Sequence, residues 1–251
     1  MAALPRELSP RQTSSFVPKP GYFPATGDDT VAGGIFCFSL TDLAAYIARV
    51  GNNPAATGTE SPKGNAAATS GSGPYPATTF TDSKLAKHTI FAPKTPPANV
   101  TMPIIVWGNG GCGTDPMATH ANILLEIASH GYVIAADGIA GGKTGASQSM
   151  VSDMKASLDW AVAGGASKYG SVNTSAIAAL GHSCGGLEAM SSAYHDDRVK
   201  RLLLFNIGIF QDEKRYLLQE IKAPVAWLIG GPKDMGYPNV GVLTPPYHLP
   251  Y

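Results

Sequence analysis

The run 181–185 reads GHSCG and places Ser183 between two glycines, with Gly186 directly after it. An apolar run, 176–180, precedes this motif, and a run with helical character, 187–194, follows it. A strand, Gly-x-Ser-x-Gly and a helix in this order are typical of a nucleophile elbow, a sharp turn that exposes the serine hydroxyl. Side chains at the flanking glycines would collide with the neighbouring strand and helix. The chemistry that such a serine supports is acyl transfer, with the Ser183 hydroxyl as the nucleophile.

Acyl transfer also needs hydrogen-bond donors for the oxygen that becomes negative during the reaction. The backbone N–H of Cys184, the residue after the nucleophile, is one expected donor. The second is expected from the glycine-rich loop that follows the apolar run 102–107. Gly110, Gly111 and Cys112 are its candidates, and the sequence does not choose among them.

A serine nucleophile further needs a base and a carboxylate that orients this base. Asp234 follows the apolar run 224–229 and is expected as the acid; a plain turn aspartate is the alternative, and Asp212 is the reserve. The base should follow the acid along the chain, and only His248 does so. His248 stands among prolines, so an idle, solvent-exposed histidine is the alternative. The other five histidines, including His182, are expected to pack in the core or lie at the surface.

Two cysteines stand in the loops that must approach each other to form this site, Cys112 and Cys184. A disulfide between them would clamp the site, and two small buried thiols are the alternative. In an oxidising compartment the disulfide is favoured, and Cys37 would then remain free. Three cysteines alone do not identify the compartment.

The segments that must position these residues alternate between strand-like and helix-like patterns. We expect strands at 86–92, 102–107, 132–136, 176–180, 199–205 and 224–229, and helices at 117–129, 149–162, 187–194 and 212–221. Such alternation predicts an α/β fold with right-handed crossovers and a mostly parallel, doubly wound sheet. The reactive groups should then gather at the carboxyl ends of the strands.

The segment 1–72 has a different composition from the rest of the chain. Residues 1–34 are rich in Pro, Ser and Thr without periodicity, and residues 52–73 have the composition of a flexible linker. Apolar residues at helical spacing predict a possible short helix at 40–50. We therefore expect a disordered or loosely packed extension over 1–72 and one α/β domain over 73–251.

The chain has 251 residues, of which 44% are hydrophobic and 14% are charged, and its formal net charge is zero. This neutral balance argues against a nucleic-acid-binding surface, which needs an excess of basic residues. No apolar run approaches the length of a membrane-spanning helix. Residues 1–19 have no apolar core of the kind that makes a secretory signal. We expect neither a cofactor nor a metal, and the oligomeric state is not indicated.

Four stretches together resemble the α/β-hydrolases, and within them the secreted fungal-type esterases of the cutinase-like, chlorophyllase-like and polyester-hydrolase kind. These stretches are 107–112, 181–186, 202–208 and 230–234. The resemblance covers about residues 73–239. It implies the α/β-hydrolase fold, secretion, and cleavage of small-molecule or polymer carboxylic esters through an acyl-enzyme on Ser183. The closing segment of such enzymes, with its histidine beside glycine, does not follow, so we expect a C-terminally incomplete version of the fold.

Two other interpretations stay open. The spacing Gly108-x-Gly110-x-x-Gly113 also fits a dinucleotide-binding fingerprint, with Asp137 at the end of the next strand as its acidic residue. That would make the protein an NAD(P)-binding oxidoreductase, although Asp115-Pro116 starts the helix after the glycines rather than among them. The other interpretation is a hydrolase-fold protein with impaired or no catalysis, because no histidine is clearly placed as the base.

Overall fold

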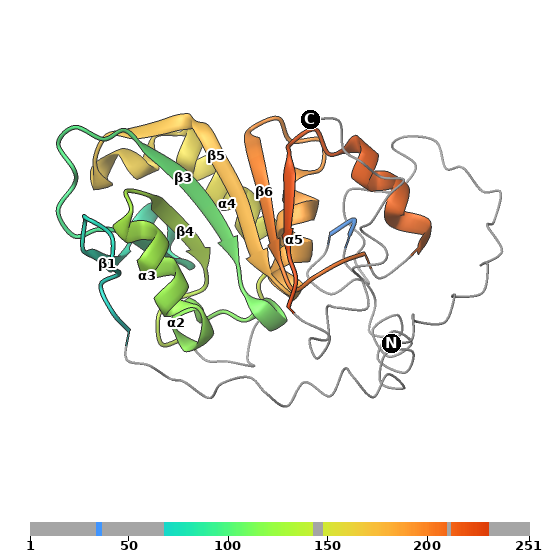
Figure 1. Ribbon diagram of the computed structural model, residues 1–251, viewed down its shortest axis with the longest axis horizontal. Helices are drawn as coiled ribbons and strands as arrows, with labels where there is room; N and C mark the ends of the chain where they lie inside the picture. The colour runs from blue at the N-terminus through green and yellow to red at the C-terminus, as the bar shows by residue number, and fades with distance from the viewer. Residues whose placement is uncertain (1–33, 37–67, 143–147, 210–211, 231–251) are drawn as a thin grey trace, which may run out of the picture.

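The computed structural model describes residues 34–36, 68–142, 148–209 and 212–230. Within them, seven strands form one sheet in the order β1-β2-β4-β3-β5-β6-β7 (Figure 1). The strands are β1 (Ala77–Thr81), β2 (His88–Pro93), β3 (Met102–Gly108), β4 (Val133–Asp137), β5 (Val172–His182), β6 (Val199–Phe205) and β7 (Val225–Leu228). The first two are antiparallel to their neighbours, and the other pairs are parallel. The predicted mostly parallel sheet is therefore confirmed.

Four α-helices accompany the sheet in the described part of the chain: α2 (Pro116–Thr119), α3 (Ala121–Ser129), α4 (Val151–Val162) and α5 (Cys184–Ala193). Short 3-10 helices are η2 (Ser83–Leu85), η3 (Gly110–Cys112), η4 (Gly165–Tyr169) and η5 (Asp212–Glu220). The expected helix at 212–221 is thus a 3-10 helix. The expected helix at 117–129 is wrong as a single element, because it is divided at His120.

The helices lie on both faces of the sheet (Figure 1). Strand β3 shows this division: Ile104 and Val106 belong to the core under α4 and α5, whereas Ile105 and Trp107 belong to the core under α3. Such alternation puts successive side chains on opposite faces, and a strand buried on both reads as a continuous apolar run. This is why the sequence of β3 could be recognised.

On α3, apolar character alone does not decide which residues are buried. Leu124 is fully buried, but Ile123 is 37% exposed. The buried face is formed by Ala121, Leu124, Leu125 and Ala128. This set has the i, i+3, i+4, i+7 spacing of a helix face that packs on a sheet.

Part of the segment expected as an extension packs on the domain. Ile35 and Phe36 are buried in the core under α4 and α5, and the Phe36 N–H donates to Ser191 Oγ at 3.2 Å. Near α3, the Gly73 N–H donates to Ser129 Oγ at 2.9 Å. The helix expected at 40–50 lies outside the described residues. Across the described chain, none of the helices is both long and apolar enough to span a membrane.

The strand order reverses its direction between β3 and β5. After β3 the chain moves to β4 on one side, and after β5 it moves to β6 on the other side. In open parallel sheets, ligands bind outside the carboxyl ends of strands at such a switch in direction. The carboxyl ends of β3 and β5 lead directly into the glycine loop and into Ser183.

Candidate active site

Ser183 forms the turn between β5 and α5. Its φ is 52° and its ψ is −119°, so a residue with a side chain takes a left-handed backbone conformation. Such a conformation costs about 1–3 kcal/mol and persists only where surrounding contacts enforce it. Here the Ser183 N–H donates to Phe205 O at 2.9 Å, and the Ser183 carbonyl accepts from the Gly186 N–H at 2.9 Å. Both contacts hold the strained turn in place.

Two glycines let this turn approach its neighbours. A Cβ on Gly181 would lie 2.1 Å from Gly185 O, and a Cβ on Gly185 would lie 2.0 Å from the carbonyl carbon of Gly108. No real side chain tolerates such distances to backbone atoms, so the predicted collisions are confirmed. The start of α5 therefore rests directly on the end of β3.

Asn109 organises the glycine loop after β3. Its side chain is buried, accepts from Trp107 Nε1 at 3.0 Å and donates from Nδ2 to Gly113 O at 2.9 Å and to Asp137 O at 2.6 Å. Its carbonyl accepts from the Gly185 N–H at 2.9 Å. Asn109 thus joins β3, β4, the loop and α5, a role that sequence reasoning missed. In the sequence, the one feature that could have indicated this role is that Asn109 is an amide residue within a run of glycines.

A disulfide joins Cys112 in the loop to Cys184 at the start of α5. The two Cα atoms are 5.2 Å apart, and 72 positions separate the residues in sequence. The bridge that the sequence favoured is therefore confirmed. It ties the glycine loop to the residue that directly follows Ser183.

The hydrogen bonds within the loop separate the three oxyanion candidates. The Cys112 N–H donates to Asn109 O at 3.1 Å, so this amide is already engaged. Among the described residues, neither the Gly110 nor the Gly111 amide donates to a backbone carbonyl, and Gly111 has a φ of 65°. Cys184 is the first residue of α5, where an N–H has no intrahelical acceptor. Within the described ranges, the amides of Gly110, Gly111 and Cys184 are therefore the candidates that make no hydrogen bond to a backbone carbonyl.

Two imidazoles lie against this loop. His120 Nε2 is 3.2 Å from His182 Nδ1, and Thr119 Oγ1 is 2.8 Å from His120 Nδ1. A Cβ on Gly110 would lie 2.4 Å from His182 Nδ1, which places the pair in direct contact with the loop. Burial, followed by the charge of His182, lowers the pKa of His120 to about 4. His120 is therefore neutral at neutral pH, as expected for a core histidine.

The break between α2 and α3 follows from the same contacts. The His120 ring packs edge-on against Trp107 at 5.3 Å between centroids. Its backbone, with φ −118° and ψ 1°, leaves the helical conformation between the two helices. Sequence periodicity could not predict this, because the partners of His120 are far away along the chain.

The proposed acid and base are not located. Asp234 and His248 both lie outside the described residues, as does the side chain of the reserve acid, Asp212. The described part of the candidate site is therefore Ser183 and the amides around it.

The fingerprint for a dinucleotide gains no support from the geometry. The Asp137 carboxylate is fully buried and lies 3.1 Å from His88 Nε2, so it is not accessible to a ligand. Burial raises the pKa of Asp137 to about 6. The helix after the glycines begins at Pro116, and Asp115 caps it by accepting from the Met117 N–H at 2.9 Å. The glycine loop therefore leads into no helix N-terminus that could hold a pyrophosphate.

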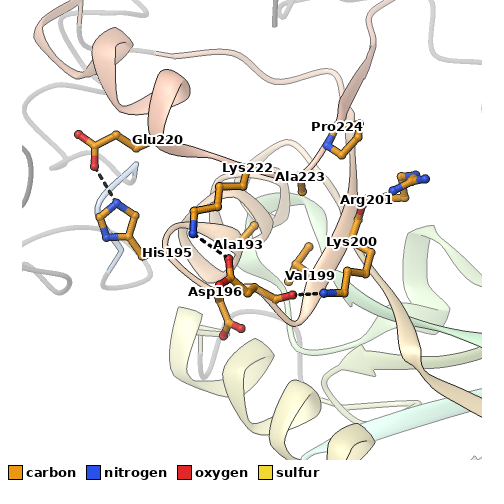
Figure 2. A pocket seen from close by; sticks show the side chains of 11 residues that line it. Ala193, His195, Asp196, Val199, Lys200, Arg201, Glu220, Lys222, Ala223 and Pro224 are labelled. Atoms are coloured by element: carbon orange, nitrogen blue, oxygen red, sulfur yellow. Dashed lines mark hydrogen bonds and ion pairs between the residues drawn. The ribbon is translucent and has the colours of Figure 1, made fainter. Parts of the chain in front are cut away.

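Two hollows open near the amino ends of the strands, away from Ser183. One, of about 400 Å³, is lined by charged side chains that pair with one another (Figure 2). His195 Nε2 lies 2.7 Å from Glu220 Oε2, and Lys222 Nζ lies 3.2 Å from Asp197 Oδ1. The other, of about 850 Å³, lies over the amino halves of β3, β5 and β6 and is mainly apolar. Neither contains the serine or the glycine loop, so volume alone does not identify the reactive site.

No set of three or more His, Cys, Asp or Glu side chains within the described ranges is arranged to hold a metal ion. Comparison of the sequence with protein-family models and with curated proteins finds no match. The functional conclusion therefore rests on the geometry around Ser183.

Proposed function

We propose that this protein is a serine hydrolase that cleaves carboxylic esters through an acyl-enzyme on Ser183. The observation that carries the proposal is the strained Ser183 turn, which the Cys112–Cys184 disulfide ties to a loop whose Gly110 and Gly111 amides donate to no backbone carbonyl of the described residues. A plain strand-to-helix turn needs neither the left-handed serine nor the bridge. The mostly parallel sheet with this turn after β5 supports an α/β-hydrolase fold.

The reaction would run in two acyl-transfer steps. The Ser183 Oγ attacks the ester carbonyl carbon, and its proton passes to the base. The oxygen that becomes negative accepts hydrogen bonds from Cys184 N–H and from the Gly110 or Gly111 amide. These hydrogen bonds are stronger in the transition state than in the ground state, so they lower the barrier. The C–O bond to the alcohol then breaks, and the base returns its proton to the leaving oxygen. Water repeats the sequence on the acyl-enzyme and releases the acid.

His248 is proposed as the base and Asp234 as the residue that orients it. The substrate is an ester of a small molecule or a polymer. The disulfide supports the expectation of a secreted protein, because such bridges persist in oxidising compartments.

The test is hydrolysis of short nitrophenyl esters by the wild type and by Ser183→Ala. We expect turnover by the wild type and a loss of at least about 1,000-fold in Ser183→Ala, since removing the nucleophile abolishes the acyl-enzyme. Ser192→Ala is the matched control, because Ser192 lies in α5 but donates to Ala189 O instead of facing the loop. Turnover that Ser183→Ala leaves unchanged would refute the assignment.

A hydrolase-fold protein with impaired catalysis is the second candidate. It is favoured by the position of His182, the imidazole next to Ser183 in sequence, whose Nδ1 lies 3.2 Å from Nε2 of the buried His120. An inactive wild type with a folded, disulfide-bonded domain would support this candidate.

A further inference from the structure

A buried carboxyl group lies directly behind the glycine loop. Glu188 belongs to α5, is fully buried, and follows Ser183 by about one and a half helical turns. Its Oε1 accepts a hydrogen bond from Ser149 Oγ at 2.9 Å. Its Oε2 has no hydrogen-bond partner among the described residues. A carboxyl group in such a position is costly, so its presence calls for a reason.

Glu188 reaches both ends of the glycine loop. At one end, a Cβ on Gly108 would lie 2.8 Å from Glu188 Oε2, so the carboxyl group rests against the last residue of β3. At the other end, the N–H of Ser149, whose hydroxyl binds Glu188, donates to Cys112 O at 2.9 Å. The chain from Glu188 through Ser149 therefore ends on the disulfide-bonded residue of the loop.

We propose that Glu188 is a positioning residue for acyl transfer: together with Ser149 it holds the loop from Gly108 to Cys112 against the Ser183 turn. This inference rests on the proposed function. The Cys112–Cys184 disulfide fixes the side chain of Cys112, and the hydrogen bond from the Ser149 N–H fixes the Cys112 carbonyl. With both in place, the Gly110 and Gly111 amides keep their direction toward the substrate carbonyl.

The buried surroundings of Glu188 favour the neutral form of its carboxyl group. Burial, followed by the charges of Asp137 on β4 and Asp153 on α4, raises the pKa of Glu188 well above its usual range, and only the Ser149 hydrogen bond opposes this. Asp137 also has a second neighbour, because His88 Nε2 on β2 lies 3.1 Å from Asp137 Oδ1. A glutamine side chain has nearly the same shape, is neutral and can accept from Ser149. Glu188→Gln should therefore preserve the support, whereas Glu188→Ala removes it and leaves the Ser149 hydroxyl without its acceptor.

The experiment compares Glu188→Gln, Glu188→Ala and Ser149→Ala with Ser192→Ala, the buried serine of α5 that does not face the loop. For nitrophenyl ester hydrolysis we expect kcat to fall roughly 10- to 100-fold in Glu188→Ala and Ser149→Ala, with KM nearly unchanged, since a misdirected oxyanion donor affects the transition state. Glu188→Gln and Ser192→Ala should stay within about threefold of the wild type. A kcat for Glu188→Gln as low as that for Glu188→Ala would overturn the neutral-acid role.

Hydrogen exchange of the full-length protein gives a readout that needs no activity. The Cys112 and Gly113 amides donate within the loop and should exchange slowly in the wild type. They should exchange faster in Ser149→Ala and Glu188→Ala and remain slow in Ser192→Ala. If the protein is not an esterase, the wild type hydrolyses no ester. The exchange pattern still shows whether Glu188 and Ser149 hold the glycine loop in place. Loop exchange in Ser149→Ala equal to that in Ser192→Ala would refute it.

Discussion

Close backbone contacts enforce the strained conformation of Ser183. Gly181 and Gly185 allow α5 to approach β3, and this approach leaves the chain a turn so short that Ser183 takes a positive φ. The conformation of the proposed nucleophile therefore depends on two glycines, which have no reactive side chain. These glycines were readable from the sequence, because their spacing around one serine belongs to a local motif.

A methyl group at Gly185 tests this dependence. Gly185→Ala places a Cβ 2.0 Å from a backbone carbon of Gly108, so strand and helix must separate. We expect a loss of about 2–4 kcal/mol in the free energy of unfolding, measured by urea denaturation. Gly113→Ala is the control, since its Cβ would meet only Gly110 O, at 3.4 Å. Equal stability of the two variants would contradict the close contact.

The buried acid Asp137 makes stability depend on pH. Because burial raises its pKa to about 6 in the folded state, the folded protein holds this proton more tightly than the unfolded chain does. The contribution of Asp137 to the free energy of unfolding is greatest below about pH 4, the pKa of an unperturbed aspartate. This contribution is lost as the pH rises through about 6. Asp82 and Asp196, whose pKa values are lowered, act in the opposite sense at lower pH.

Asp137→Asn isolates this contribution. The difference in the free energy of unfolding between wild type and variant should shift in favour of the variant from pH 4 to pH 7, as followed by chemical denaturation. A difference that stays constant over this range would show that the carboxyl group titrates normally in the fold.

At the level of elements, the site depends on how η3 and α5 are joined. Periodicity and glycine placement predicted the strands around them, because β3 and the second half of β5 are apolar and largely buried. Strand β1 was not predicted, since its residues are mostly half-buried at the sheet edge and give no clear alternation. The separation of α2 from α3 also escaped prediction, because the ring of His120 is held by Trp107 and His182 from other elements.

The bridge between η3 and α5 can be removed by substitution. The double variant Cys112→Ser/Cys184→Ser should lose about 4 kcal/mol of stability, as estimated for a closed loop of this length. Its esterase activity should fall further than its stability at the assay temperature explains, because the loop amides lose their fixed direction. Thermal melts and initial rates check both effects. Cys37→Ser, which leaves the bridge intact, should match the wild type, and full activity in the double variant would contradict the clamp.

For the whole molecule, the strand order explains where the site lies. The chain leaves β3 and β5 in opposite directions, so their carboxyl ends lie at a switch point of the sheet, which local motifs alone do not reveal. The acid and the base were predicted only from chain order, and Asp234 and His248 remain predictions. Their assignment depends on long-range placement, for which residue spacing carries no signal.

His248→Ala tests the base independently of the nucleophile. If His248 takes the proton from Ser183, kcat for nitrophenyl esters should fall at least about 1,000-fold, with the domain still folded. His195→Ala is the control, because His195 pairs with Glu220 at the amino ends of the strands. Wild-type turnover in His248→Ala would assign the base to another group.

Covalent labelling with a fluorophosphonate, followed by peptide mapping, tests most directly whether Ser183 is an activated nucleophile. An activated serine opposite amide donors reacts with this phosphorus centre, whereas an ordinary hydroxyl does not. We expect one adduct, on the peptide that contains Ser183, and no adduct in Ser183→Ala. An unlabelled wild type, or a label on another serine, would show that Ser183 is not the nucleophile.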